Sequence, residues 1–239
     1  MLDPVIALFP NLQQQRLRRW RQRLLHPGWP ALLRRTTPLS TEWGFDRGTP
    51  IDRYYIEHFL ATHQQDIQGR VLEVKDNSYA LRYGHAVTQS DVVDIDPANP
   101  HATLIADLSA ADAIAADQFD CFVLTQTLQL IYDVQAVVAH AHRILRPGGV
   151  LLVTVPCISR IVPRYGLQTD YWRFTPASCM RLFGQVFGAQ QISVCSYGNV
   201  LSSMAFLNGM ASEELSRHEL ETRDDYFPVI IAVRAIKQE

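Results

Sequence analysis

Polar side chains stand at the ends of several apolar stretches of this 239-residue chain, and their types suit the binding of a polar ligand. Glu73 and Asp76 follow the first stretch, Asp91 and Asp107 belong to the next two, and Gln126 ends the fourth. Carboxylates accept charge-assisted hydrogen bonds and attract positive charge. In an open parallel sheet, ligands bind beyond the carboxyl ends of the strands. We therefore expect these residues to share a binding site.

Several common catalytic motifs are missing from the sequence. It contains no G-x-G-x-x-G, no G-x-x-x-x-G-K-[ST] and no G-x-S-x-G, and its eight histidines include no H-x-x-x-H pair. These absences argue against a nicotinamide dehydrogenase of the usual type, and no metal site is predicted. The four cysteines are scattered without paired spacing. They are typical of reduced thiols, so we expect a cytoplasmic protein.

Alternating elements must position the polar residues. Apolar patterning predicts seven strands, at 70–74, within 85–95, and at 102–108, 119–127, 150–156, 191–198 and 228–236. Helical spacing predicts helices over 49–65, 133–145 and 175–187. Thr49 and Thr175 are the expected N-caps, Pro50 the first helical residue of its helix, and Arg146–Gly149 the stop of the second helix.

Strands that alternate with helices predict an α/β fold. We expect a Rossmann-like, doubly wound, mostly parallel sheet of seven strands, with helices on both faces and an N-terminal helical extension. The continuous apolar strand at 150–156 fits a sheet buried on both sides. Residues 200–215 are expected to form a helical insertion before an antiparallel last strand.

Charge divides the chain near Pro50. Residues 1–53 hold nine Arg and four acidic residues, whereas residues 54–239 hold 13 basic and 20 acidic ones, and the net charge is −2. We predict a basic helical extension or lid over 1–48 and one domain over 49–239, with no nucleic-acid partner. Leu17, Trp20 and Leu24 form the stripe of a basic amphipathic helix. Such a helix either packs on the domain or makes weak contact with an anionic membrane surface.

Five motifs stand in order along the middle of the chain: VLEV (71–74), ADL (106–108), FDCFVLTQTLQLIYD (119–133), HRILRPGGVLLVTVP (142–156) and DYWRFTPAS (170–178). With these motifs the chain resembles the class I S-adenosylmethionine-dependent methyltransferases over roughly residues 70–190. WGFDRGTPIDRYYIE (43–57) is similar to the leader of type 11-like bacterial methyltransferase domains that lie beside glycosyltransferase modules.

The resemblance implies S-adenosylmethionine as the cofactor. It implies that Glu73, with the loop at Asp76, orders the methionine end, and that an acid of the second strand binds the ribose hydroxyls. Asp91 is the choice by spacing, with Asp94 and Asp96 as alternatives because strand ends are uncertain by about two to four residues. It further implies that Asp107 and the Leu108 backbone meet the adenine, and that Gln126 lies under the methionine moiety.

The acceptor is expected over the ends of the fourth and fifth strands. Tyr132, Tyr171 and Arg173 are the candidate contacts there. The segment 43–55 is expected to cover the acceptor as a lid, in which Arg47, Arg53, Tyr54 and Tyr55 are candidate polar contacts. Transfer from an activated methyl donor needs alignment of the acceptor more than a nucleophile of the protein. The acceptor is expected to be a small molecule or a glycan.

One position departs from the family pattern. The family has glycines after the first strand, where this chain has Glu73-Val74-Lys75-Asp76-Asn77. Glycine permits a left-handed backbone and a close approach to the cofactor. The lysine therefore keeps two alternatives open, a methyltransferase-like binding or regulatory module without activity and an unrelated Rossmann-like enzyme.

Overall fold

The computed structural model describes residues 11–25, 35–162 and 167–238. These residues form two compact units. The larger unit holds Ile56–Tyr197 and the chain from Ile230 onward, and the smaller holds the described residues up to Tyr55 together with Gly198–Val229.

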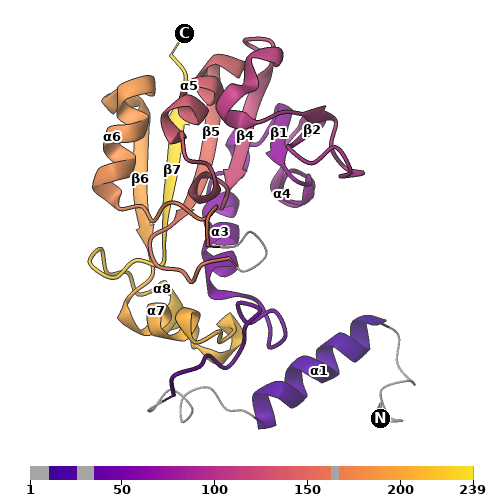
Figure 1. Ribbon diagram of the computed structural model, residues 1–239, viewed down its shortest axis with the longest axis vertical. Helices are drawn as coiled ribbons and strands as arrows, with labels where there is room; N and C mark the ends of the chain where they lie inside the picture. The colour runs from indigo at the N-terminus through magenta and orange to yellow at the C-terminus, as the bar shows by residue number, and fades with distance from the viewer. Residues whose placement is uncertain (1–10, 26–34, 163–166, 239) are drawn as a thin grey trace. The chain divides into compact units, whose positions relative to one another are not determined.

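The larger unit is built on one seven-stranded sheet with the order β3-β2-β1-β4-β5-β7-β6 (Figure 1). The strands are β1 (Gly69–Val74), β2 (Val87–Asp94), β3 (Leu104–Ile105), β4 (Phe119–Thr125), β5 (Leu145–Pro156), β6 (Ile192–Tyr197) and β7 (Ile230–Ile236). Strands β1 to β5 are parallel, and β7 runs antiparallel between β5 and β6. The predicted fold class and the antiparallel last strand are confirmed.

Helices connect the strands of this sheet. They are α4 (Ser78–Tyr83), α5 (Val134–Ile144) and α6 (Pro176–Phe187), with the C-terminal half of α3 (Ile51–Thr62) and the short 3₁₀ turns η2 (Gln64–Asp66), η3 (Leu108–Ala113), η4 (Leu128–Leu130) and η5 (Ala189–Gln191). The smaller unit contains α1 (Asn11–Leu25), α7 (Val200–Leu207), η6 (Ser212–Glu214) and α8 (Arg217–Glu221). The predicted insertion between the last two strands is therefore helical.

The main core lies between one face of the sheet and the helices α5 and α6. Leu72, Phe122 and Val153 point from the strands into this core, where Val138 of α5 and Phe183 of α6 are also buried. Apolar residues spaced by three or four positions give these two helices one inward face. Burial of such large side chains stabilises each by about 1.5–3 kcal/mol relative to exposure.

The opposite face of the sheet is also buried. Val71, Cys121 and Leu152 alternate with the core residues along their strands and are fully buried. Phe59 of α3 is buried as well, and its ring centroid lies 6.5 Å from that of Tyr197 in β6. The sheet is thus covered on both sides, as the uniformly apolar strands predict.

Several predicted boundaries differ from the structure, and the third strand, predicted over 102–108, spans only Leu104–Ile105. The residues Arg146–Gly149 do not form a separate loop, because β5 already begins at Leu145, which pairs with Phe119 across a register shift. Helix α3 begins at Ile51 instead of Pro50, whose carbonyl accepts the amide of Tyr54 at 3.1 Å. The predicted N-cap Thr175 is confirmed, since its hydroxyl accepts the Ser178 amide at 3.2 Å.

The smaller unit contains a buried ion pair. Arg47 is 1% exposed, and its guanidinium donates to both carboxylate oxygens of Glu214, at 2.6 and 2.9 Å. The Tyr55 hydroxyl donates to the carbonyl of Leu220 at 3.0 Å. Loss of one partner of such a buried pair is strongly destabilising. Arg47 therefore joins the segment before α3 to η6 inside this unit, a structural role in place of the expected polar contact to the acceptor.

Candidate functional site

The carboxyl ends of three central strands meet at one edge of the sheet. Glu73 of β1 is in register with Val92 of β2 and Val123 of β4. Because the strands are parallel, the residues that follow them share this edge. The structure therefore brings together the polar ends of β1, β2 and β4, which are the residues from Glu73 to Asp76, Asp94, and Gln126.

Glu73 orders the connection between β1 and α4. Its side chain is buried, and the two carboxylate oxygens accept the amides of Tyr79 at 3.1 Å and Ala80 at 2.9 Å. A carboxylate at the start of a helix satisfies amides that have no partner within the helix. Asp76 supports the same turn by accepting the Ser78 amide at 3.0 Å. Both acids thus hold the loop in which a cofactor would rest.

Lys75 takes up the left-handed conformation that the missing glycine would adopt easily. Its φ is 74°. Its amide donates to the Val93 carbonyl at 3.0 Å, and its own carbonyl accepts the Asn99 side-chain amide at 2.7 Å. The side chain is exposed. The lysine therefore leaves the turn intact, at the cost of backbone strain.

Asp94 is the last residue of β2 and lies beside this turn. Its Oδ1 accepts the Asp96 amide at 3.0 Å, and its Oδ2 accepts the Asn99 side-chain amide at 2.6 Å. One Asn99 amide thus joins the Asp94 carboxylate to the Lys75 carbonyl. Sequence reasoning missed Asn99, for which the turn residues that follow β2 are the only local signal. A carboxylate retains acceptor positions beyond two hydrogen bonds.

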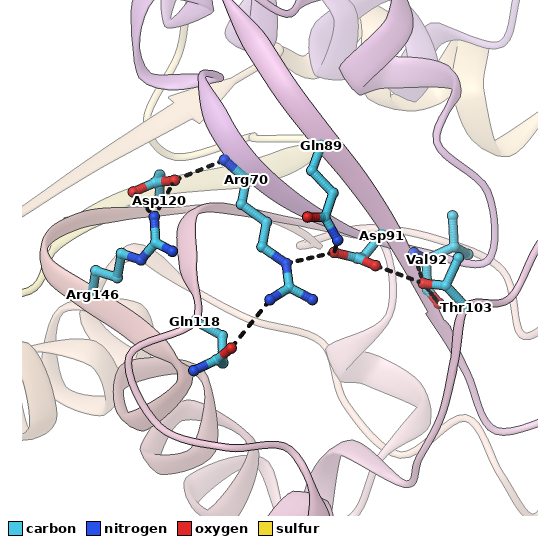
Figure 2. A network of polar contacts seen from close by, with 8 residues as sticks. All are labelled: Arg70, Gln89, Asp91, Val92, Thr103, Gln118, Asp120 and Arg146. Carbon is cyan, nitrogen blue, oxygen red and sulfur yellow. Dashed lines mark hydrogen bonds and ion pairs between the residues drawn. The ribbon is translucent and has the colours of Figure 1, made fainter.

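Asp91 occupies a different place from Asp94. It lies three residues before the end of β2, opposite Leu72. Figure 2 shows its carboxylate within a polar network, where it accepts Arg70 Nε at 2.7 Å, Gln89 Nε2 at 2.9 Å and the Thr103 hydroxyl at 3.1 Å. A buried acid with these donors joins β1 to β2 and to the segment before β3. The choice by spacing therefore falls on a residue with a structural role.

Asp107 follows β3 and begins η3. Its Oδ1 accepts both the amide and the hydroxyl of Ser109, at 2.8 and 2.7 Å, and the residue is exposed. Leu108 is buried beside it. The amide of Ala106 donates to the Asp94 carbonyl at 3.0 Å. Asp107 thus stays close to the end of β2, as the predicted adenine contact requires.

Gln126 continues directly from β4 with a left-handed backbone, at a φ of 47°. Its amide donates to the Thr154 carbonyl at 2.8 Å, and its own carbonyl accepts Gln129 Nε2 at 2.8 Å. Gln126 Nε2 is buried and has no hydrogen-bond partner within the described parts of the chain. A buried amide without a partner is costly, and a bound ligand would satisfy it.

Aromatic side chains gather near the end of β4. The ring centroids of Tyr132 and Tyr171 are 5.4 Å apart, and those of Tyr132 and Trp172 are 5.8 Å apart. Arg173 pairs with Asp170 at 2.6 Å. Burial disfavours the charge of Asp170, but hydrogen bonds from Arg173 and from the Val162 amide outweigh burial and hold the pKa of Asp170 below its usual value. Three predicted acceptor contacts thus lie together.

The fourth predicted acceptor contact, Tyr54, lies in the smaller unit. Its ring centroid is 5.5 Å from that of Tyr55. Burial and the neighbouring Glu221 carboxylate raise the pKa of its hydroxyl above the usual value.

Among the described residues, no helix combines the length and the apolar composition that a membrane span requires.

The sheet order and the helices on both faces define a Rossmann-like, doubly wound fold. Residues 28–194 match the family model described as a methyltransferase domain. The chain therefore belongs to the methyltransferase domain family, which excludes the alternative of an unrelated Rossmann-like enzyme. No curated protein matched the chain.

Solved structures share the fold at low sequence identity. A SAM-dependent methyltransferase from Archaeoglobus fulgidus has a TM-score of 0.52 and 11% identity, with 77% of this chain and 94% of that chain covered. The [4+2]-cyclase SpnF has a TM-score of 0.53 and 12% identity, with 94% of this chain and 96% of that chain covered. These identities establish a common fold, and the fold by itself does not fix the reaction.

Proposed function

We propose that this chain transfers a methyl group from S-adenosylmethionine to a small-molecule or glycan acceptor. The observation that carries the proposal is the shared carboxyl edge of the sheet. There Asp94 ends β2, Gln126 follows β4 with β1 between these two strands, and the buried Gln126 Nε2 lacks a partner in the described chain. Because the Lys75 side chain is exposed, its ammonium does not fill the turn after β1, which supports the proposal.

The residues at this edge fit the parts of the cofactor. We assign the ribose hydroxyls to Asp94 in place of Asp91, because Asp94 ends its strand while Asp91 binds Arg70. Asp107 and the Leu108 backbone are assigned to the adenine, and Gln126 to the ammonium and carboxylate region of the methionine moiety. Glu73 and Asp76 act by holding the turn after β1.

The chemistry asks the protein mainly to position the acceptor. The cofactor supplies a methyl group that its sulfonium already activates, so alignment and exclusion of water account for most of the acceleration. Tyr132, Tyr171 and Arg173 stand near the end of β4 and are assigned to the acceptor. Tyr54 and the residues before position 49 are assigned to a lid over the domain that begins at 49. A leader of the kind found beside glycosyltransferase modules supports the glycan alternative.

A second candidate is a methyltransferase-like domain that has lost cofactor binding and serves as a binding or regulatory module. The observation in its favour is the turn at Lys75, which has a left-handed backbone at a lysine instead of a glycine. Strain of this kind weakens a cofactor loop if the bound state needs another conformation.

Titration calorimetry with S-adenosylhomocysteine separates the two candidates. We expect binding by the wild-type chain and a loss of about tenfold or more in Asp107→Ala, since a hydrogen bond to a charged group is worth about 1.5–3 kcal/mol. Asp112→Ala is the matched control, because Asp112 is an exposed acid of the same turn η3. Absence of heat at millimolar ligand would favour the module.

We also propose that α1 makes weak contact with an anionic membrane surface. The helix carries five arginines and no acidic residue. Its apolar side chains remain exposed, with Trp20 at 58% and Leu24 at 59%. A helix with arginines on one side and tryptophan and leucine on the other lies at the boundary of headgroups and acyl chains. The apolar stripe favours lipid over nucleic acid, which would contact only the arginines.

A further inference from the structure

We propose that the acceptor is an uncharged, planar ring system that stacks on an aromatic platform formed by Tyr132, Tyr171 and Trp172. The inference rests on the proposed methyl transfer, because it names the class of molecule that the same site receives. Between the two acceptor classes left open above, it favours a small aromatic molecule over a glycan.

The platform offers ring surface to solvent. Tyr132 is 70% exposed and Tyr171 is 46% exposed, unusually high values for large aromatic side chains that also contact each other. The planes of these two rings meet at 72°, whereas Tyr132 and Trp172 are tilted by only 31°. A planar molecule in this corner stacks on one ring and meets the edge of another. Both are favoured arrangements of aromatic pairs.

Backbone hydrogen bonds hold the rings in place. The Trp172 indole nitrogen donates to the carbonyls of Ile131 and Tyr132, at 3.1 and 3.2 Å. The amide of Tyr171 donates to the Gln129 carbonyl at 2.8 Å. Two segments about forty residues apart are thus fixed to each other. A platform that is already ordered loses little conformational entropy when a ligand binds.

The same hydrogen bonds connect the platform to the cofactor edge. Gln129 accepts the amide of Tyr171 through its carbonyl and donates from its side chain to the Gln126 carbonyl, both at 2.8 Å. Gln126 is the residue that we assign to the methionine end of the cofactor. The platform is therefore two hydrogen bonds away from Gln126, a suitable position for an acceptor.

The cation of the segments that carry the platform is already paired. In the described segments 128–133 and 167–174 the charged side chains are Asp133, Asp170 and Arg173. Asp133 caps α5 by accepting the Ala136 amide at 3.0 Å. Arg173 pairs with Asp170. An anionic acceptor would find no available cation in these segments, and an uncharged ring matches the exposed aromatic surface best.

Sugar hydroxyls would also find few partners. Besides its pair with Asp170, Arg173 donates to the carbonyls of Ser159, Arg160 and Trp172 at 3.3, 2.9 and 2.8 Å. Ligand sites obtain orientation from a small number of polar groups that remain available. At this platform the ring surfaces remain available, while the charged groups are committed.

The test compares probe molecules on the full chain in the presence of S-adenosylhomocysteine. The probes are 2-naphthol, decahydro-2-naphthol, methyl α-glucoside and tetramethylammonium, with affinities from ligand-observed NMR titration. We expect 2-naphthol to bind about five- to tenfold more tightly than its saturated counterpart, the ratio expected for one or two aromatic contacts. The sugar and the cation should bind more weakly than 2-naphthol.

Variants locate the binding. Tyr132→Leu combined with Tyr171→Leu should remove the preference for 2-naphthol, and Tyr132→Phe should keep it because the ring remains. Tyr226→Leu is the matched control, since Tyr226 is 91% exposed in the smaller unit. Thermal unfolding checks that the variants fold.

Two results would overturn the inference while leaving the proposed function standing. They are equal binding of 2-naphthol and decahydro-2-naphthol, or tightest binding of the sugar or the cation, in a chain that binds S-adenosylhomocysteine. If 2-naphthol shows the expected preference and S-adenosylhomocysteine gives no heat, the platform stands and the proposed methyl transfer fails.

Discussion

Replacement of Lys75 by glycine tests the strain in the turn after β1. The residue has a φ of 74° and an exposed side chain. A left-handed backbone costs an L-residue about 1–2 kcal/mol, which glycine avoids. Glycine also makes the unfolded chain more flexible, which costs about 0.4–1 kcal/mol. We therefore expect Lys75→Gly to increase the free energy of unfolding by about 0.5–1 kcal/mol.

Lys75→Ala is the matched control for this prediction. Alanine keeps the Cβ atom and hence the strain, and it removes only an exposed side chain. Its free energy of unfolding should stay within about 0.5 kcal/mol of the wild type. Urea titration followed by circular dichroism measures both, as a shift of the midpoint at constant slope.

Equal stability of the glycine and alanine variants would refute the reasoning. It would mean that the backbone at Lys75 is not strained, or that the turn has another conformation in solution. Binding of S-adenosylhomocysteine by the same two variants adds a functional reading. If the strain also limits the loop, Lys75→Gly should bind more tightly than Lys75→Ala.

Three further predictions concern other parts of the chain. Asp94→Asn should weaken binding of S-adenosylhomocysteine by about tenfold or more. Asp91→Asn should leave this affinity unchanged and lower the free energy of unfolding by about 1–3 kcal/mol. If calorimetry shows the reverse pattern, the ribose is reassigned to Asp91. Burial of Asp66 is outweighed by hydrogen bonds from Arg234 and His63, which lower the pKa of Asp66 to about 2. The stability from this pair is present above the unfolded pKa near 4 and is lost as the pH falls through about 2, so acid titration should show a loss of about 1 kcal/mol that Asp66→Asn lacks. The wild-type chain should sediment with phosphatidylglycerol vesicles but not with phosphatidylcholine vesicles. Either Trp20→Gln or high salt should reduce the binding to phosphatidylglycerol vesicles. Sedimentation with neither kind of vesicle would refute the membrane contact.

The strand pattern could be predicted from the sequence because burial on both sides requires nearly continuous apolar residues. Burial on both faces fixes the strand at 119–125. The side chain of Thr175, which accepts a backbone amide, fixes the start of α6. The start of β5 could not be predicted, because Pro147 and Gly148 are typical of turns, while pairing of Leu145 with Phe119 extends the strand.

The candidate site was harder to predict than the fold. Asp91 and Asp94 are three residues apart, and the sequence does not show which of them ends β2. Their hydrogen-bond partners in the structure distinguish the two acids. The support that Asn99 gives to the Lys75 turn joins residues 24 positions apart, so no local pattern indicates it. The aromatic platform depends likewise on contacts between Tyr132 and a segment about forty residues away.

The most direct test of the central claim is a crystal structure of the chain grown with S-adenosylhomocysteine. We predict electron density for the nucleoside at the carboxyl edge of the sheet, with the ribose hydroxyls within hydrogen-bonding distance of Asp94 and the adenine beside Asp107 and Leu108. Density for the ligand elsewhere on the chain, or an empty edge in a crystal grown at saturating ligand, would contradict the account.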